Sequence, residues 1–152
     1  MLKENTVLKI IVKFLCFYFI IGIIIIISCT ESGTDPRDEN VVLPDSNLTY
    51  NDHIYKLFLL KCGSREGCHS YTNPARNLVL IEYDMFRYKS LSGAGGGLLI
   101  LNGNGEASPL YKILVDSYYA GVPKMPKDGP YLNSNQTDGV RQWINEGAPI
   151  SN

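Results

Sequence analysis

Two cysteines and a histidine near the middle of the chain are the residues whose types and spacing are best suited to chemistry. The stretch "LLKCGSREGCHS" contains Cys62, Cys68 and His69, and Cys68 directly precedes the histidine. A cysteine followed at once by a histidine is the second half of the C-x-x-C-H site at which c-type haem is attached. The first half differs, because five residues instead of two separate the cysteines. Three chemistries stay open: covalent haem attachment, a disulfide and a metal site.

Covalent haem attachment uses all three side chains. The two thiols add across the vinyl groups of the porphyrin, and the histidine next to the second thiol becomes the proximal ligand of the iron. The longer spacing requires that the five intervening residues bulge outwards. Gly63 and Gly67, the first and last residues of this bulge, provide the backbone freedom for such a hinge.

The two other chemistries use the same residues without haem. A disulfide between Cys62 and Cys68 would staple the domain, whose exposed loops would then bind another exported protein or a glycan. A zinc site would combine the two thiolates with the imidazole of His69 and, as fourth ligand, His53. The spacing of these residues matches none of the usual structural zinc patterns.

Composition limits the other classes of function. The chain has 152 residues and a formal net charge of −1, which allows one modest domain and argues against a nucleic acid as partner. It contains only two histidines, and neither has a nucleophile pattern or paired carboxylates nearby. The sequence therefore favours a binding or electron-transfer protein and not an enzyme.

The N-terminus has the layout of a secretory signal peptide. Three lysines within the first 13 residues precede an uninterrupted apolar run that ends at Ser28 and Cys29. The stretch "IISCT" resembles the lipobox of bacterial lipoproteins. That resemblance implies a signal peptide over residues 1–28, cleavage before Cys29 and acylation of its thiol; a retained anchor helix is the alternative. In both cases the rest of the chain is exported.

Residues 29–48 are expected to form a flexible tether. They are rich in Asp, Glu, Ser, Pro and Asn and lack periodic apolar residues. The domain proper is then predicted over residues 49–152. With Cys16 in the leader and Cys29 lipidated, Cys62 and Cys68 are the thiols left in this domain, and in an oxidising compartment such thiols are expected to be bonded to something.

Four short helical patterns, separated by glycine and proline, predict an all-α domain with long loops. The first begins at Thr49 or Asn51 and stops at Cys62. The second and the fourth are "YDMFRYKSL" and "SNQTDGVRQWINEGAP". The third has Ser108 as N-cap and Pro109 at its first position. The first pattern has Ile54, Leu57 and Phe58 at helical spacing, and the second places Tyr83, Phe86 and Tyr88 near one another. The third has Leu110, Ile113 and Leu114 on one face, and the fourth has Val140, Trp143 and Ile144 on one face.

The connections carry their own signals. The run "GGLLIL" before the third helix is strand-like, and the prolines of "GVPKMPKDGPYL" exclude a helix over residues 121–132 and predict an extended surface loop. A core built from four short helices is thin for a domain of about a hundred residues. A staple or a bound cofactor would therefore help to stabilise it.

The order of these features resembles the cytochrome-c-like domain of exported lipoproteins that is often called the planctomycete type. The stretches that carry the resemblance are "FLLKCGSREGCHS", "NLVLIEYDMFRYKSL", "GGLLILNGNGEASPLYKIL" and "MPKDGPYLNSNQTDGVRQWINEGA", which together span most of residues 49–148. The resemblance implies haem c as cofactor, with Cys62 and Cys68 as thioether donors, His69 as proximal ligand and Met125 as distal ligand.

The same resemblance implies a membrane-anchored carrier of single electrons in the cell envelope. Ligation by histidine and methionine fills both axial positions of the iron, which suits electron transfer better than oxygen activation. Met85 is the competing distal ligand, although packing is its expected role. The implied partners are the membrane, through the lipid on Cys29, and another redox protein; Thr30, in place of an inner-membrane retention signal, favours the outer membrane.

Overall fold

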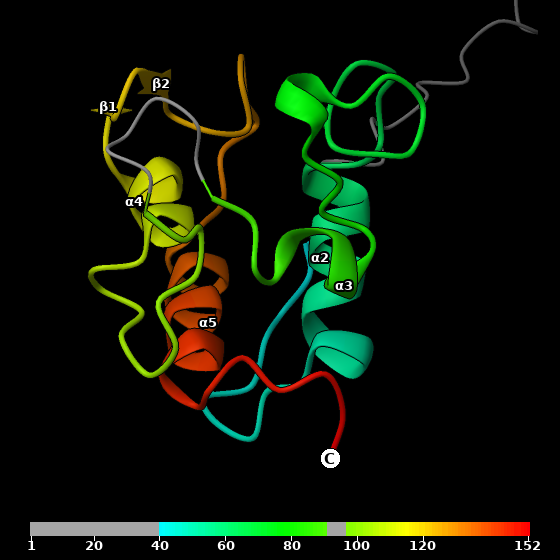
Figure 1. The fold of residues 1–152 in the computed structure, drawn as a ribbon. Helices are drawn as coiled ribbons and strands as arrows, with labels where there is room; N and C mark the ends of the chain where they lie inside the picture. The colour runs from blue at the N-terminus through cyan, green and yellow to red at the C-terminus, as the bar shows by residue number, and fades with distance from the viewer. Residues whose placement is uncertain (1–39, 91–96) are drawn as a thin grey trace, which may run out of the picture. The chain divides into compact units, whose positions relative to one another are not determined.

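A computed structural model describes residues 40–90 and 97–152 of the chain. The described part is mainly helical, as expected, and also contains a small two-stranded antiparallel sheet that the all-α prediction lacked. Figure 1 shows its elements, which in chain order are a π-helical turn (Tyr50–Ile54), α2 (Tyr55–Lys61), a 3-10 turn (Ala75–Asn77), α3 (Tyr83–Phe86), α4 (Pro109–Val115), β1 (Tyr118–Tyr119), β2 (Val122–Pro123) and α5 (Ser134–Asn145).

The first helical segment follows the prediction closely. Thr49 is the N-cap, and its hydroxyl accepts a hydrogen bond from the backbone N–H of Asp52. The π-helical turn leads directly into α2, which ends with Cys62 as C-cap. The side chains of Ile54, Leu57 and Phe58 are completely buried, so this segment contributes the expected apolar face to the core.

The second helix is shorter than predicted. It covers only Tyr83–Phe86, because no apolar side chain among residues 87–90 packs into the core to hold a further turn. Tyr83 and Phe86 lie close together, with ring centroids 5.9 Å apart. Tyr88 is 73% exposed and does not belong to the core.

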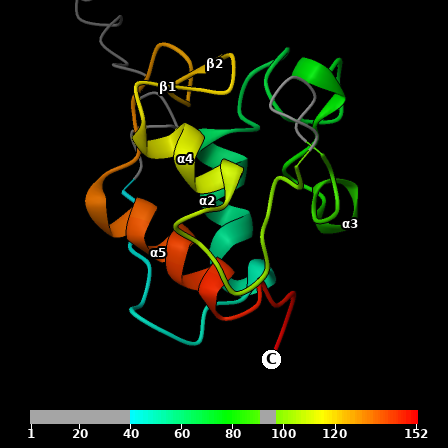
Figure 2. The same ribbon diagram turned by 60° about the vertical axis from the view of Figure 1, so that its left-hand side comes forward.

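The last two helices form as predicted. They are consecutive helices of the chain and pack side by side (Figures 1 and 2). In α4, Leu110, Ile113 and Leu114 are buried. Ser108 takes the N-cap position, but its hydroxyl bonds Leu101 and Asn104 instead of the helix. A capping box of Asn133 and Gln136 begins α5. Its residues Val140, Trp143 and Ile144 are completely buried.

Residues 41–48, here called the N-terminal strap, belong to the packed domain and not to the tether. Val41, Leu43 and Leu48 are buried in the core. The side chain of Asn135 accepts from the N–H of Leu43 and donates to its carbonyl, and Gln136 donates to the carbonyl of Val41 at 3.0 Å. The packed domain therefore begins before the expected residue 49. The sequence did not show this, because the few apolar residues of the strap pack on α5 without the spacing of a helix.

Glu146, the C-cap of α5, binds the end of the strap. The carboxylate of Glu146 accepts hydrogen bonds from the backbone N–H of Leu48 at 2.7 Å and of Asn47 at 2.9 Å, and from the side chain of Gln142 at 3.0 Å. Partial desolvation pushes the pKa of this carboxyl up, but the three hydrogen bonds outweigh it and hold the pKa below its usual value. Because the folded-state pKa is depressed, the stabilisation is present above the unfolded pKa and is lost as the pH falls through the folded one.

Glu146→Gln is therefore expected to lower the free energy of unfolding at neutral pH by about 1–2 kcal/mol, since a carboxylate acceptor is lost from two backbone donors. The difference from wild type should shrink as the pH falls through the depressed pKa of Glu146, because the wild-type carboxyl is itself protonated below it. Urea denaturation at several pH values measures it. Glu106→Gln, whose carboxylate is 4.0 Å from Arg141 at an exposed position, is the matched control and should change stability by less than about 0.5 kcal/mol. If the difference in free energy of unfolding stayed constant across this pH range, the ionised carboxylate of Glu146 would not be the group that holds the strap.

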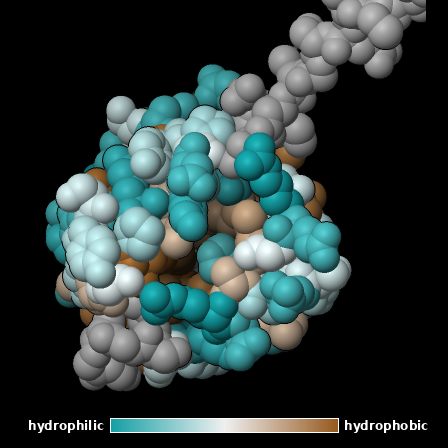
Figure 3. All heavy atoms as spheres, turned by 90° about the horizontal axis from the view of Figure 1, so that it is seen from above, coloured by the Kyte–Doolittle hydropathy of each residue, from teal (hydrophilic) through white to brown (hydrophobic). Residues whose placement is uncertain are grey.

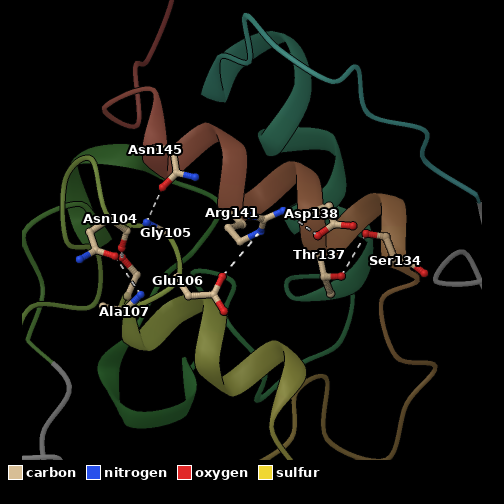
Figure 4. A network of polar contacts seen from close by, with 10 residues as sticks. Asn104, Gly105, Glu106, Ala107, Ser134, Thr137, Asp138, Arg141 and Asn145 are labelled. Carbon is tan, nitrogen blue, oxygen red and sulfur yellow. Dashed lines mark hydrogen bonds and ion pairs between the residues drawn. The ribbon is translucent and has the colours of Figure 1, made fainter.

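The loop before α4 is tied to α5 by a polar network, shown in Figure 4. The backbone N–H of Gly105 donates to the side chain of Asn145 at 2.7 Å. Arg141 bonds Asp138 at 3.1 Å and lies 4.0 Å from Glu106. A side chain at position 105 would collide with the backbone carbonyl of Arg141, so only glycine permits this close approach. The network fixes the point at which α4 begins.

Residues 1–39, which include the expected signal peptide and Cys29, lie outside the described residues. The predictions made for them are therefore not examined by the structure. Among the residues that are described, no helix is both long and apolar enough to cross a membrane.

Candidate functional site

A deep apolar pocket opens between the end of α2, the segment that follows it, α4, and the loop after β2. It encloses about 820 Å³ between the protein atoms, its open mouth included. Figure 3 shows a hollow with apolar residues in its depth and polar residues around its rim. The apolar residues of its walls are Phe58, Ala75, Leu78, Leu80, Leu110, Ile113, Leu114 and Pro126.

The structure brings four of the predicted site residues together in this pocket. Cys62, Cys68, His69 and Met125 all line it. The first three come from one short segment. Met125 comes from the loop after β2, and α3 and α4 lie between it and that segment in the sequence. The fifth predicted site residue, Cys29, lies outside the described residues.

The backbone around the histidine is held in place from both sides. The residues between the two cysteines bulge and then return, so that the N–H of His69 donates to the carbonyl of Cys62 at 2.9 Å. The carbonyl of His69 accepts from the N–H of Leu80, also at 2.9 Å. Despite the long spacing, Cys62 thus lies next to the Cys68–His69 pair.

The two glycines of the bulge serve different purposes. Gly67 has a φ of +75°, the left-handed conformation expected of a hinge. Gly63 does not; it is needed because a Cβ there would come within 2.7 Å of the side chain of Ile81. Gly67 thus adopts the conformation expected of a hinge, whereas Gly63 lets the chain pass close to Ile81.

The imidazole of His69 has a defined tautomer. Its Nδ1 lies 3.0 Å from the carbonyl oxygen of Leu78, and because a carbonyl can only accept, Nδ1 must carry the hydrogen. Burial lowers the pKa of His69, and the hydrogen bond to Leu78 only partly opposes this. The ring is therefore neutral, with the lone pair of Nε2 available to a ligand. Metal-ligating histidines are oriented in this way, by a hydrogen bond from the other ring nitrogen.

The two cysteines are free thiols in the structure, Cys62 buried and Cys68 half-buried. Burial raises the pKa of the Cys62 thiol to about 12, and the neighbouring Cys68 adds to this effect while Lys61 opposes it. Cys62 is thus a neutral thiol in an apolar wall. In the described part of the chain, no three Cys, His, Asp or Glu side chains gather closely enough to hold a metal ion, so the donor set proposed for zinc does not converge.

Met125 is fixed beside the pocket by its own backbone and by its neighbours. Its N–H donates to the carbonyl of Ile113 in α4 at 2.8 Å, and its side chain packs partly buried against the core. Pro123 and Pro126 flank it, and each proline restricts the backbone of the loop. A thioether held in this way is presented to the pocket at little further cost in conformational entropy.

The competing residues lie elsewhere. Met85 is on α3, does not line the pocket and is 48% exposed, so the expectation that it packs in the core is wrong. His53 also lies outside the pocket lining. Its Nδ1 accepts a hydrogen bond from the N–H of Thr49 at 3.1 Å, which gives this histidine a structural role at the start of the π-helical turn.

Two lysines of the pocket were missed by the sequence analysis. Lys61 and Lys127 line it, and no aspartate or glutamate is among the described lining residues. Lys61 follows Leu57 and Phe58 by four and three positions, so it lies on the buried face of α2. That spacing was the signal that could have revealed it.

Comparison with protein-family models, with curated proteins and with solved structures finds no match for this chain. The functional inference therefore starts from the site. A neutral imidazole, a thioether and two thiols around an apolar pocket are suited to a flat apolar ring that carries a metal ion.

Proposed function

We propose that this protein is a membrane-anchored monohaem c-type cytochrome that carries single electrons in the cell envelope. The observation that supports the proposal most is that Cys62, Cys68, His69 and Met125, the haem-binding residues implied by the resemblance to a cytochrome-c-like domain, line one apolar pocket. In this proposal the mainly helical domain has a cytochrome-c-like fold. Its partner is another redox protein of the envelope.

Each of the four residues has a distinct task. Cys62 and Cys68 would hold the porphyrin as thioethers, which their free thiols and the apolar walls permit. His69 would ligate the iron through Nε2, because Nδ1–H is engaged by Leu78. Met125 would hold the iron through its thioether sulfur, and a soft sulfur ligand would favour the ferrous state. A haem bound there supplies an iron that accepts and releases one electron.

The proposal is tested most directly by the absorption spectrum of the full chain, produced in a host with c-type maturation machinery. A c-type cytochrome shows the sharp visible bands of six-coordinate ferrous haem when it is reduced. Protein that folds but has no visible absorption would refute the proposal. In that outcome, a disulfide-stapled binding module becomes the better description.

Anchoring through Cys29 is the part of the proposal that concerns location. The acylated cysteine would become the first residue of the mature protein and hold the domain at the membrane, with the outer membrane preferred. Cys29→Ala is expected to leave uncleaved precursor and to abolish labelling by a radioactive fatty acid, because the acylated thiol is missing. Normal size and normal labelling of this variant would refute the anchor, and Cys16→Ala, within the leader, is the matched control.

Met125→Ala is expected to leave haem bound but to open the sixth coordination position of the iron. The reduced variant should then bind carbon monoxide readily, and the oxidised variant should lose the weak absorption that arises from a sulfur–iron bond. Met85→Ala is the matched control, because Met85 is exposed on α3 and does not line the pocket. If Met85→Ala opens the iron and Met125→Ala does not, the distal ligand has been assigned wrongly.

A further inference from the structure

Tyr50 places a polar hydroxyl in the aromatic part of the core. It is the first residue of the π-helical turn, and its exposure is only 3%. Its ring centroid lies 5.4 Å from that of Tyr83, 5.6 Å from Phe86 and 6.3 Å from Trp143. A tyrosine hydroxyl that is buried in this way usually has a hydrogen-bond partner. Burial raises the pKa of Tyr50 above its usual value, so the hydroxyl keeps its proton and is able to donate.

The hydroxyl of Tyr50 donates to the carbonyl oxygen of Leu80 at 3.0 Å. Leu80 lies in the wall of the pocket and is itself 3% exposed. The N–H of Leu80 donates to the carbonyl of His69 at 2.9 Å. The carbonyl of Leu78 accepts from Nδ1–H of the same histidine at 3.0 Å. Residues 78–80 thus carry both groups that fix His69, and Tyr50 holds this segment from the side of the core.

We infer that Tyr50 is a positioning residue for His69: its hydroxyl holds residues 78–80 in place, so that the imidazole keeps its hydrogen on Nδ1 and leaves Nε2 free to bind a ligand. The inference rests on the proposed function, in which Nε2 binds the iron. It adds a residue that acts through the backbone, since Tyr50 is not among the described residues that line the pocket. Loss of a group that orients a metal-binding histidine typically costs about 10–100-fold in metal affinity.

Tyr50→Phe removes the hydroxyl and keeps the ring in the aromatic cluster. The buried carbonyl of Leu80 then loses this donor, and the cost of an unsatisfied buried acceptor favours displacement of residues 78–80. The measurement is proton–nitrogen magnetic resonance of the imidazole in the haem-free full chain in detergent, which distinguishes Nδ1–H from Nε2–H. Wild type should show His69 with its hydrogen on Nδ1. In Tyr50→Phe the ratio of Nε2–H to Nδ1–H is expected to rise about tenfold.

Tyr83→Phe is the matched control. The ring of Tyr83 belongs to the same aromatic cluster, but its hydroxyl donates to the carbonyl of Ala148 at 2.7 Å and not to residues 78–80. This variant should lose stability and keep the tautomer ratio of His69 within about twofold of wild type. His53 is an internal reference, because its Nδ1 accepts a hydrogen bond and its hydrogen is therefore on Nε2.

Two further residues at position 50, introduced by stop-codon suppression, separate the donor from the shape of the side chain. Para-aminophenylalanine retains an N–H donor and should restore the wild-type tautomer of His69. Para-methylphenylalanine fills the space of the hydroxyl without donating and should behave like Tyr50→Phe. If Tyr50→Phe does not fold, the para-methyl variant is measured in its place.

An unchanged tautomer ratio in Tyr50→Phe would overturn the inference and leave the proposed function intact, because haem attachment is read separately from the visible spectrum. A change of the same size in Tyr83→Phe would also overturn it, since altered packing and not the bond to Leu80 would then be responsible. If wild type carries no haem in the maturation host, the proposed function fails. The tautomer of His69 in the haem-free chain would still decide whether Tyr50 positions this histidine.

Discussion

Replacing both Cys62 and Cys68 with alanine is expected to abolish haem staining of the polypeptide on denaturing gels, while the wild-type chain from the same host keeps its stain. A thiol that has added across a vinyl group leaves a carbon–sulfur bond that denaturants do not break. Without the two thiols, only His69 and Met125 would hold the haem, and both contacts are lost when the chain unfolds. The expected effect is therefore complete loss of the stain.

Single variants separate the contributions of the two cysteines. Cys62→Ala should retain staining through the bond at Cys68, because the Cys68–His69 pair is intact. Ser64→Ala, in the exposed bulge between the cysteines, is the control and should stain like wild type. The contrary outcome is a wild-type protein that does not stain and is two hydrogen atoms lighter than the dithiol form. A disulfide between Cys62 and Cys68 would then replace the haem.

Trp143→Ala is expected to lower the free energy of unfolding by about 3–5 kcal/mol, as large-to-small changes of buried aromatic residues do. Trp143 is completely buried in α5, and its ring lies 6.3 Å from Phe58 and from Tyr50 and 6.5 Å from Phe86, between centroids. The substitution also leaves the carbonyl of Pro149 without the indole N–H that bonds it at 3.0 Å. Domains of this size are stable by only about 5–15 kcal/mol, so much of the total would be lost.

Because Trp143 is the single tryptophan of the chain, the variant must be followed by far-ultraviolet circular dichroism and not by fluorescence. Chemical denaturation of wild type and variant gives the difference in free energy. Tyr118→Ala is the control, since this aromatic residue is 67% exposed and its loss should cost less than about 0.5 kcal/mol. A loss below 1 kcal/mol for Trp143→Ala would show that the aromatic cluster is not the centre of the core.

The sequence was most informative where local signals agree with burial. The spacing of Ile54, Leu57 and Phe58 predicts the buried face of α2, and Pro109 predicts the start of α4, because propensity and packing favour the same conformation there. The grouping of the candidate site could be anticipated only through the resemblance to a known domain. No local pattern connects Met125 with His69, since the pocket that joins them depends on the packing of α2 and α4.

The failures have equally specific causes. The strap looked like a tether because its apolar residues, Val41, Val42, Leu43 and Leu48, follow no helical period. What buries it is α5, more than ninety residues further along the chain. The short β1–β2 hairpin contains a proline and only two residues in each strand, too few for an alternating pattern. Lys61 was overlooked because a lysine on a buried helix face contradicts the usual distribution of charge.

The strap also fixes the order in which the chain is able to fold. Its hydrogen bonds to α5 and to the C-cap Glu146 join residues 92 to 99 positions apart, and contacts of such separation form late and slowly. If the chain is exported from its N-terminus, as proposed, Cys62, Cys68 and His69 would cross the membrane well before α4, Met125 and α5. Ligation of the proposed haem from both sides would have to wait for those later segments. Bond formation at the two thiols would need none of them, so covalent attachment would be open to the chain before its pocket exists.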